Sequence, residues 1–441
     1  MRYFMTLMTA VSITLTAVAQ STGPRAEWRF KKNDTAHFTE SGHYHAASGE
    51  GVIEFVSKQA TTTTPLHKNS PSIEQMQAGD YWLMRMPVEQ VKAGSVVDVW
   101  FPFLVAPHKT PHTFICEYRD GKQWLPAEDL TTGTARCLST TAATWPRFTW
   151  RTFRLKRGIK RGELQFRLRQ VDHEPLKTAL YGGGSGDAPK MVVLDNRTPT
   201  DTTRLLFIGN SYTFYNLYPM QLKEIAWYEG HYLDCEIYVH GGYNTTQHLA
   251  NHVARKTIAE GGYDYTFLQD QSLSALYIGT TLDHGVISEM KRLITLVKEY
   301  NPQSTIFIEQ TWGRREGNNA INTKQQALVE AHPSFFTDYE AMQRVIIANT
   351  NRMSEELDTA LSPVGVAWQI VRHEHPEIEL YAKDAHHPST AGSYLSAVVA
   401  YQMLFRTPFS TQAANVDLDA ATAAYLRSVA ERVVLQGEQA E

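Results

Sequence analysis

The sequence predicts a protein of two domains: an N-terminal all-β sandwich of jelly-roll type, and a C-terminal α/β domain of three layers around a parallel sheet. The 441 residues suffice for two hydrophobic cores. Short runs rich in β-branched and aromatic residues, without helical periodicity, fill residues 25–196. From residue 203 to 437 short apolar runs alternate with helical patterns, which is typical of a parallel sheet covered by helices. The polar segment around Pro199 predicts the domain boundary.

Residues 1–19 predict a secretory signal peptide. Arg2 supplies a positive charge, residues 4–18 are mostly apolar, and the small residues Ala17 and Ala19 fit a cleavage site before Gln20. This apolar run is too short for a convincing membrane anchor, and no later segment is apolar enough to span a bilayer. We therefore expect a secreted or periplasmic bacterial protein whose mature chain begins near Gln20.

In the expected sandwich, Gly, Pro and Asp turn signals separate the candidate strands. The Asp120-Gly121 pair between two such strands predicts a hairpin. Its many tryptophans could form a sugar-stacking platform or belong to the core, and the core is the better interpretation for each residue. The expected strands are residues 51–56, 80–86, 95–105, 113–118, 148–155, 164–170 and 190–194.

In the C-terminal domain the expected strands are short and apolar, and the expected helices are amphipathic. The expected strands are residues 205–208, 234–239, 265–268, 305–309 and 361–367. The expected helices are residues 219–229, 245–260, 283–300, 321–330, 339–356, 388–404 and 417–435.

Charge and cysteine spacing argue against a nucleic-acid-binding protein and against a zinc site. A net charge of −4 gives no basis for a nucleic-acid surface. The three cysteines show no zinc-site spacing. Cys116 and Cys137 could bridge a hairpin-sized loop in an oxidising compartment or remain free, and the sequence leaves this open. Cys235 lies within a strand pattern and is expected to be a buried apolar residue.

A serine follows the first strand of the α/β domain. Ser211 comes after the apolar run 205–208 and Gly209, and a helical pattern begins a few residues later. Ligands of open α/β sheets bind at the carboxyl ends of strands, which is where this serine is expected. Alone, such a serine is better interpreted as a helix cap.

Two further segments follow the next strands. Gly241 and Gly242, after the second strand, permit close backbone approach to a ligand at a helix N-terminus. The segment Gln269-Asp270-Gln271-Ser272 comes directly after the third strand, and two amides and a carboxylate are unusual for a simple connection.

The segment Asp384-Ala385-His386-His387-Pro388 opens the last long helix of the sheet domain, and we expect Pro388 at its first helical position. A serine that transfers acyl groups needs a base and a group that orients this base, and Asp-x-x-His supplies both. The alternative is a helix capped by Asp384 with two solvated histidines. The spacing and the adjacent proline favour His387 over His386.

These motifs together resemble the SGNH (GDSL-like) hydrolase superfamily over residues 204–405, most closely a little-characterised bacterial branch with a Gly-Asn-Ser nucleophile block. The resemblance implies a flavodoxin-like α/β fold. It also implies that Ser211 is the nucleophile, His387 the general base and acid, and Asp384 its orienting carboxylate. The implied oxyanion hole uses the N–H groups of Ser211 and of Gly242 or Gly241, with a side-chain amide.

The sequence departs from the superfamily pattern twice. Asn210 replaces the usual aspartate before the nucleophile, a carboxylate that the triad does not need. The usual Gly-x-Asn-Asp block is absent, and the Gln269–Ser272 segment stands in its place, resembling the Gln-Gly-Glu-Ser block of sialate and xylan acetylesterases. By this comparison Gln269 is the amide donor, with Gln271 as the alternative.

We expect substrate-contacting residues around the nucleophile. They are Asn210, Gly241, Tyr243 and Trp312, with His240 as a further candidate. No metal or organic cofactor is expected, because a site made of Asp384, His386 and His387 lacks further ligands at recognisable spacing.

The sequence therefore predicts a secreted serine esterase that removes small acyl groups, acetate above all, from carbohydrates through an acyl-enzyme. Its partner would be an acetylated glycan, with no nucleic acid. A lipase or thioesterase is the alternative within the same class, although no long apolar lid is evident. The alternative outside that class is an inactive glycan-binding protein.

Overall fold

The computed structural model describes residues 23–30, 43–57, 63–66, 70–105, 112–138, 150–180, 188–199, 201–318, 321, 325–411 and 413–439. The expected signal peptide lies outside the described residues. None of the helices among them has the length and apolar character needed to cross a membrane.

The N-terminal part consists of antiparallel sheets, as the sequence predicts. One sheet has the strand order β13-β8-β16-β1-β3, a second β11-β10-β14-β7-β4-β2 with β12 also paired to β10, and a third β5-β6-β15-β9. Alternate residues of these strands point inward and form one core that includes Ile53, Trp82 and Phe153. The strands are β1 (Arg25–Glu27), β2 (His43–His45), β3 (Ser48–Gly49), β4 (Val52–Val56), β5 (Thr63–Leu66), β6 (Ser70–Met76), β7 (Tyr81–Val91), β8 (Val96–Trp100), β9 (Phe103–Val105), β10 (Thr113–Asp120), β11 (Gln123–Pro126), β12 (Arg136–Leu138), β13 (Trp150–Arg154), β14 (Ile159–Gln170), β15 (Leu176–Leu180) and β16 (Lys190–Val193).

One prediction for this part needs adjustment and another is confirmed. Residues 95–105 form two strands in different sheets, because the chain turns at Phe101-Pro102 and proline cannot continue a ladder. The hairpin at Asp120-Gly121 is present, with Asp120 paired to Gln123.

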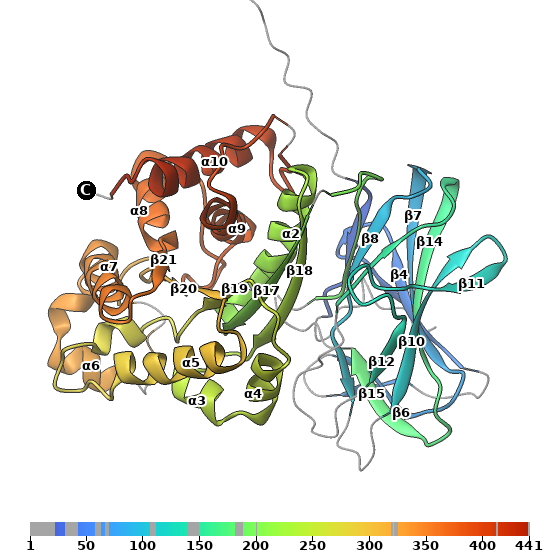
Figure 1. The fold of residues 1–441 in the computed structure, drawn as a ribbon, viewed down its shortest axis with the longest axis horizontal. Coiled ribbons are helices and arrows are strands. Elements are labelled where there is room, and N and C mark those ends of the chain that lie inside the picture. The colour runs from blue at the N-terminus through green and yellow to red at the C-terminus, as the bar shows by residue number, and fades with distance from the viewer. Residues whose placement is uncertain are drawn as a thin grey trace, which may run out of the picture.

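The C-terminal part has a parallel sheet with the strand order β18-β17-β19-β20-β21, which is the flavodoxin-like order 2-1-3-4-5. Successive residues of β17 face opposite sides: Phe207 packs against the layer of α2, α8, α9 and α10, and Ile208 against that of α4, α5 and α7. Figure 1 shows these helices around the sheet. The strands are β17 (Thr202–Gly209), β18 (Tyr232–Val239), β19 (Tyr265–Leu268), β20 (Thr305–Glu309) and β21 (Ala360–Ser362).

The helices of this part are α1 (Ser211–Phe214), α2 (Tyr218–Tyr228), α3 (Thr245–Ala250), α4 (His252–Ala259), α5 (Val286–Tyr300), α6 (Gln326–Ala331), α7 (Tyr339–Glu356), α8 (Val364–Glu374), α9 (Thr390–Phe405) and α10 (Ala420–Leu435). The 3₁₀ helices are η1 (Tyr215–Leu217), η2 (Ser274–Tyr277) and η4 (Pro333–Phe336).

Three expected elements differ in the structure. The helix expected over residues 245–260 is two helices, because Asn251 is extended and caps α4. The strand expected over residues 361–367 ends at Ser362, and the apolar residues after Pro363 form the buried helix α8. Pro388 precedes α9 rather than starting it, because Ser389 is the N-cap.

The antiparallel and α/β parts share a continuous apolar contact. Val96 and Trp100 of β8 belong to the same core cluster as the helix α2. Inside this contact, the Lys223 ammonium of α2 lies 3.0 Å from the Asp98 carboxylate and donates to the Thr152 hydroxyl at 2.7 Å. Figure 1 shows α2 and β18 on the side of the α/β part that faces the antiparallel sheets.

Candidate active site

The site begins at the turn from β17 into α1. A Cβ atom on Gly209 would lie 2.2 Å from the Thr213 hydroxyl and 2.9 Å from the Gln269 side-chain oxygen, so only glycine fits there. The chain passes closely over these two side chains, and half-buried Ser211 is the first residue of α1.

A series of hydrogen bonds connects Ser211 to two residues far along the chain. The Ser211 hydroxyl lies 2.7 Å from Nε2 of His387. The other ring nitrogen, Nδ1, lies 2.7 Å from Oδ2 of Asp384. The His387 backbone N–H also donates to the second Asp384 oxygen at 3.0 Å, which fixes the carboxylate relative to the ring. This arrangement can pass a proton from the hydroxyl to the imidazole and stabilise the imidazolium that results.

The histidine segment is held from several sides. The His387 carbonyl accepts from the Ala382 N–H at 2.8 Å, and Ala385 takes a left-handed conformation with φ 63°. Asn216 of η1 donates to the Pro388 carbonyl at 3.0 Å. The segment is thus positioned by contacts on both sides of His387.

Burial and the contact between His387 and Asp384 shift the pKa of each of these two residues in opposite directions. Burial lowers the pKa of His387 below its usual value, while the hydrogen bond to Asp384 raises it and the Arg314 charge lowers it further. Burial alone would raise the pKa of Asp384, but the hydrogen bonds and charge of His387 hold it below the usual range. His387 is therefore neutral and Asp384 ionised at neutral pH, which is the protonation state that a general base needs.

His386 lies beside His387 but has a different environment. Its Nδ1 lies 3.2 Å from the Asp384 backbone carbonyl, and burial together with the charges of Arg314 and His387 lowers its pKa to about 4. Ligand atoms of Asp384, His386 and His387 lie within 4.8 Å of one another, so these three could approach one ion. However, both ring nitrogens of His387 already have partners in Asp384 and Ser211.

Asn210, expected at the substrate, joins three loops. Its side-chain oxygen accepts from the Tyr212 N–H at 3.1 Å. Its side-chain nitrogen donates to the carbonyls of Tyr243 at 3.0 Å and Asp270 at 3.1 Å. Asn210 is buried, so its place in the structure is that of a positioning residue rather than a substrate contact.

The two candidate amide donors occupy different places. Gln269 is buried under the turn: its oxygen accepts from the Asn210 N–H at 2.9 Å and from the Thr213 hydroxyl, and its nitrogen donates to the Asp270 carbonyl. Half-buried Gln271 donates to the Ser272 hydroxyl at 3.3 Å and accepts from the Leu273 N–H. The geometry therefore favours Gln271 over Gln269 as a group that a substrate could reach.

The glycine loop lies next to this turn. Gly241 and Gly242 are exposed, and Gly242 has a φ of 74°, a conformation that favours glycine. In the part of the chain that the structure describes, no hydrogen bond uses the N–H of Ser211 or of Gly242. Tyr243 stacks on His240 with ring centroids 3.7 Å apart, and both are half-buried.

Trp312 does not lie where the sequence predicted. It is fully buried at 0% exposure, stacks between Tyr212 and Trp368 with centroid distances of 4.5 and 3.9 Å, and donates to the His386 carbonyl at 3.1 Å. A side chain without exposed surface cannot contact substrate. Trp312 instead supports the histidine segment from behind.

Sequence reasoning missed two neighbours of the histidines. Tyr215 stacks on the His387 ring, with centroids 4.0 Å apart and planes 5° from parallel. Arg314 is buried and donates to the hydroxyls of Tyr212 and Ser272, the latter at 3.3 Å. The only signal for Arg314 was its position shortly after β20; Tyr215 had none.

Comparisons with protein-family models and with curated proteins found no match to this chain. Among solved structures it is similar to a DUF4886 family protein from Bacteroides uniformis, at 18% sequence identity and a TM-score of 0.45, with 55% of this chain and 98% of that chain covered. A GDSL-like lipase from Parabacteroides merdae is similar at 17% identity and a TM-score of 0.32, with 46% and 95% covered.

A family two carbohydrate esterase from Clostridium thermocellum is also similar, at 13% identity and a TM-score of 0.30, with 80% of this chain and 98% of that chain covered. GDSL-type hydrolases and carbohydrate esterases are thus among the structural neighbours of this chain.

Proposed function

We propose that the protein is a serine esterase with Ser211 as nucleophile, His387 as general base and acid, and Asp384 as the orienting carboxylate. The observation that carries the proposal is the hydrogen-bonded series from the Ser211 hydroxyl through both His387 ring nitrogens to Asp384, with a distance of 2.7 Å at each step. This is the geometry that nucleophilic acyl transfer requires.

In the proposed mechanism the Ser211 oxygen attacks the ester carbonyl while Nε2 of His387 takes the hydroxyl proton. The tetrahedral intermediate collapses, His387 gives that proton to the leaving alcohol, and an acyl-serine remains. Water, deprotonated by His387, then attacks the acyl-serine, and His387 returns the proton to the Ser211 oxygen as the acid is released. Asp384 keeps the Nδ1 proton in place and stabilises the imidazolium in both steps.

The oxyanion of each intermediate needs hydrogen-bond donors. We propose the N–H groups of Ser211 and Gly242, with the Gln271 side-chain amide as the third donor in place of Gln269. Two observations support this choice: the Asn210 side chain holds the Tyr243 carbonyl, and with it the glycine loop, beside the nucleophile, and the Gln269 amide is buried under the turn. Loss of one such donor typically lowers kcat by about 10²–10³-fold.

We propose a carbohydrate O-acetyl ester as substrate, and a secreted or periplasmic protein that acts on it with residues 203–437 as the catalytic domain. The signal-peptide pattern of residues 1–19 and the resemblance of the Gln269–Ser272 segment to acetylesterases support this specificity. The antiparallel part, residues 25–196, would contribute glycan binding or stability.

Acetate release from an aryl acetate and from acetylated polysaccharides tests the proposal. The wild-type protein is expected to release acetate, and Ser211→Ala to lower kcat by about 10³-fold or more. Ser428→Ala changes a serine on α10 whose hydroxyl donates to the Tyr425 carbonyl of its own helix; it is the matched control and is expected to keep full activity. Full activity of Ser211→Ala would contradict the proposed nucleophile, and wild-type inactivity on every ester would favour a glycan-binding protein.

A further inference from the structure

Two cysteine sulfurs lie close together in the antiparallel part, away from the candidate active site. The Sγ atoms of Cys116 on β10 and Cys137 on β12 are 3.5 Å apart and are not bridged. Both residues are buried, with 3% and 6% of their surface exposed. The strands are antiparallel and Cys137 pairs with Phe114, so the two cysteines are diagonal neighbours on the inner face of the sheet.

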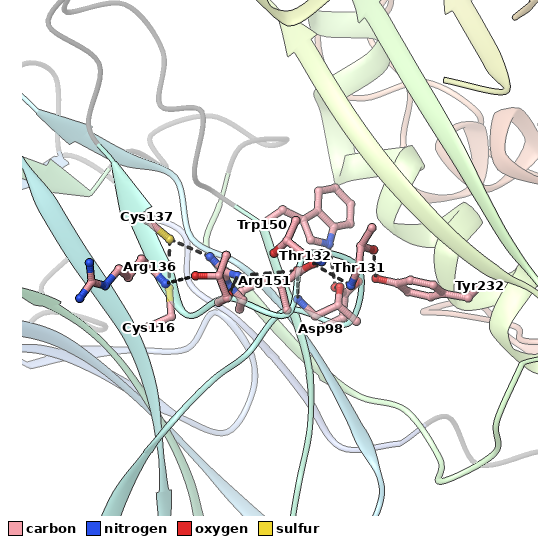
Figure 2. Close-up of polar contacts among 12 residues, drawn as sticks. Asp98, Cys116, Thr131, Thr132, Arg136, Cys137, Trp150, Arg151 and Tyr232 are labelled. Atoms are coloured by element: carbon pink, nitrogen blue, oxygen red, sulfur yellow. Dashed lines mark hydrogen bonds and ion pairs between the residues drawn. The ribbon is translucent and has the colours of Figure 1, made fainter. Parts of the chain in front are cut away.

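A buried guanidinium accompanies the pair. Arg151 of β13 donates to the Cys137 sulfur at 2.8 Å and to the Thr134 carbonyl at 2.5 Å, and it lies 3.9 Å from the Asp129 carboxylate. Figure 2 shows Arg151 next to the two sulfurs. A cation in contact with a sulfur stabilises the thiolate, which is the nucleophilic form of cysteine.

The two thiols have different acidities. The hydrogen bond with Cys116 and the Arg151 charge lower the pKa of Cys137 to about 7, against the effect of burial. The same hydrogen bond and burial raise the pKa of Cys116 well above its usual value. One thiol can therefore attack as a thiolate at neutral pH while the other keeps its proton, as a pair that exchanges disulfides requires.

We propose that Cys116 and Cys137 are a disulfide-forming pair, with Cys137 as the attacking thiolate held by Arg151, and that the bridge stiffens the segment between them at the contact with the α/β part. This inference is independent of the esterase proposal, since it concerns thiols that the proposed mechanism does not use.

The segment between the cysteines reaches the other part of the molecule. The Asp129 carboxylate accepts from the N–H groups of Thr131 and Thr132 at 3.0 and 3.2 Å. Thr131 then donates its hydroxyl to the Tyr232 hydroxyl at 3.4 Å. Tyr232 begins β18, the strand paired with β17, which leads to Ser211. Figure 2 shows this path from the sulfurs to Tyr232.

The chemistry balances with a small disulfide such as oxidised glutathione as the oxidant. The Cys137 thiolate attacks one glutathione sulfur, which forms a mixed disulfide and releases one glutathione thiolate. Cys116 then loses its proton and attacks the Cys137 sulfur, which releases the second glutathione. Both protein sulfurs are oxidised and one external disulfide is reduced, so two electrons pass to glutathione. The single proton lost by Cys116 is taken up by one of the two released glutathione thiolates.

The geometry needs only a small movement for the final bond. The sulfurs must approach from 3.5 Å to the roughly 2.05 Å of a disulfide. The strand β12, which carries Cys137, has three residues and pairs with β10 alone among the described strands. Its opening would admit the oxidant more easily than would that of the long central strands.

The test counts free thiols in the full-length protein. The protein is equilibrated with glutathione at several ratios of reduced to oxidised form. It is then denatured in the presence of N-ethylmaleimide, which alkylates free thiols, and its mass is measured by intact mass spectrometry. We expect three adducts in the reducing buffer and one in the oxidising buffer, with peptide mapping placing the remaining adduct on Cys235. Three adducts at every ratio, or a bridge that includes Cys235, would overturn the proposal.

Thermal unfolding tests the effect of the bridge. The oxidised protein is expected to unfold roughly 5–10 °C higher than the reduced protein, since a bridge over a loop of this size restricts the unfolded chain. Cys137→Ser should abolish the difference between buffers, and the control Cys235→Ser should preserve it. Equal melting temperatures in the two buffers would refute a stiffening role.

The rate at which the disulfide forms tests whether Arg151 stabilises the Cys137 thiolate. Arg151→Met is expected to slow oxidation at pH 7 about tenfold, because a smaller fraction of Cys137 is then thiolate. Since this variant could also disturb the core, the wild-type rate is measured as well and should rise as pH passes through about 7. An oxidation rate of the wild-type protein that does not depend on pH would exclude Cys137 as the attacking thiolate.

Discussion

At the residue scale, the candidate site combines a neutral imidazole with an ionised carboxylate. His387 is partly buried. Its ring stacks on that of Tyr215, with the two centroids 4.0 Å apart, and its Nδ1 contacts the Asp384 carboxylate. Burial and the Arg314 charge favour the neutral imidazole, while Asp384 favours the charged one, and the net effect is a lowered pKa. This balance suits a base that must be unprotonated in the resting enzyme.

The pH dependence of kcat/KM follows from that balance. The proposed mechanism requires neutral His387, so activity should fall as pH decreases through the pKa of this residue. Because that pKa lies below the usual 6.5, the acid limb of the profile is expected below pH 6.5. Initial rates on a soluble acetate ester between pH 4 and 8 measure it. An acid limb above pH 7 would contradict the lowered pKa.

Asn210→Asp tests whether the two hydrogen bonds that the Asn210 side chain donates are needed for activity and stability. An aspartate at this position still accepts from the Tyr212 N–H, but it cannot donate to the carbonyls of Tyr243 and Asp270. Each buried carbonyl left without its partner costs about 1–3 kcal/mol, so we expect kcat/KM to fall about tenfold or more and the unfolding free energy to decrease.

Asn244→Asp is the matched control for that change. Asn244 caps α3 by accepting from the Gln247 N–H at 3.0 Å, and among the described residues its side-chain nitrogen donates to nothing. Aspartate is an equally good N-cap, so activity and stability should remain close to wild type. Equal losses in both variants would show that the two donated hydrogen bonds of Asn210 are unimportant.

At the element scale, an aromatic stack supports the segment that leads into α9. Trp312 follows β20 and packs between Tyr212 of α1 and Trp368 of α8. Its indole N–H donates to the His386 carbonyl. Three elements that are distant in sequence thus hold the nucleophile turn and the histidine segment in one relative position.

Trp312→Phe removes that hydrogen bond while keeping an aromatic ring. We expect kcat to fall about fivefold, equivalent to about 1 kcal/mol, because the histidine segment is less well held. Trp368→Phe removes similar volume from the same stack without removing this bond, and should lower stability more than kcat. Steady-state kinetics and thermal unfolding of both variants separate the effects. A larger loss of kcat in Trp368→Phe would contradict the assignment.

At the scale of the whole molecule, the antiparallel and α/β parts are joined by buried charge as well as apolar packing. The Lys223 ammonium has 4% of its side chain exposed and Asp98 has 3%, and the Lys223 nitrogen lies 4.4 Å from the centroid of the Trp150 ring. Such a pair is costly to break, because removing one partner leaves the other charge buried without compensation.

Lys223→Met is therefore expected to lower the unfolding free energy by about 3–5 kcal/mol. The double variant Lys223→Met with Asp98→Asn should recover part of this loss, because neither charge remains. Arg292→Ala, which removes an exposed ion pair with Glu289 on α5, is the control and should change stability by less than about 1 kcal/mol. Denaturant unfolding measures these three variants and Asp98→Asn alone. A loss in the double variant equal to the sum of the losses in Lys223→Met and Asp98→Asn would refute coupling.

The sequence predicted strongly patterned elements well. The expected strands 265–268 and 305–309 and the helix 339–356 have the bounds of β19, β20 and α7. Short strands such as β1 and β12 carry too few residues to show a period. Helix α8 was mistaken for a continuation of β21 because its first eight residues are buried all round, so it has no polar face to reveal a helical period.

For the candidate site, the sequence led us to propose the residues whose spacing is local. Asp384 and His387 are three residues apart on one segment, and Ser211 ends a recognisable strand-to-helix turn. The places of Trp312 and Gln269 could not be predicted, because they depend on how α8, the histidine segment and the nucleophile turn pack in three dimensions.

The central claim, that Ser211 is an activated nucleophile, is tested most directly by covalent trapping. The full-length protein is incubated with a fluorophosphonate, and the modified residue is located by peptide mass spectrometry. We predict one adduct, on Ser211, that is absent in Ser211→Ala and forms much more slowly in His387→Ala. Labelling of another serine, or unchanged labelling of His387→Ala, would contradict the account.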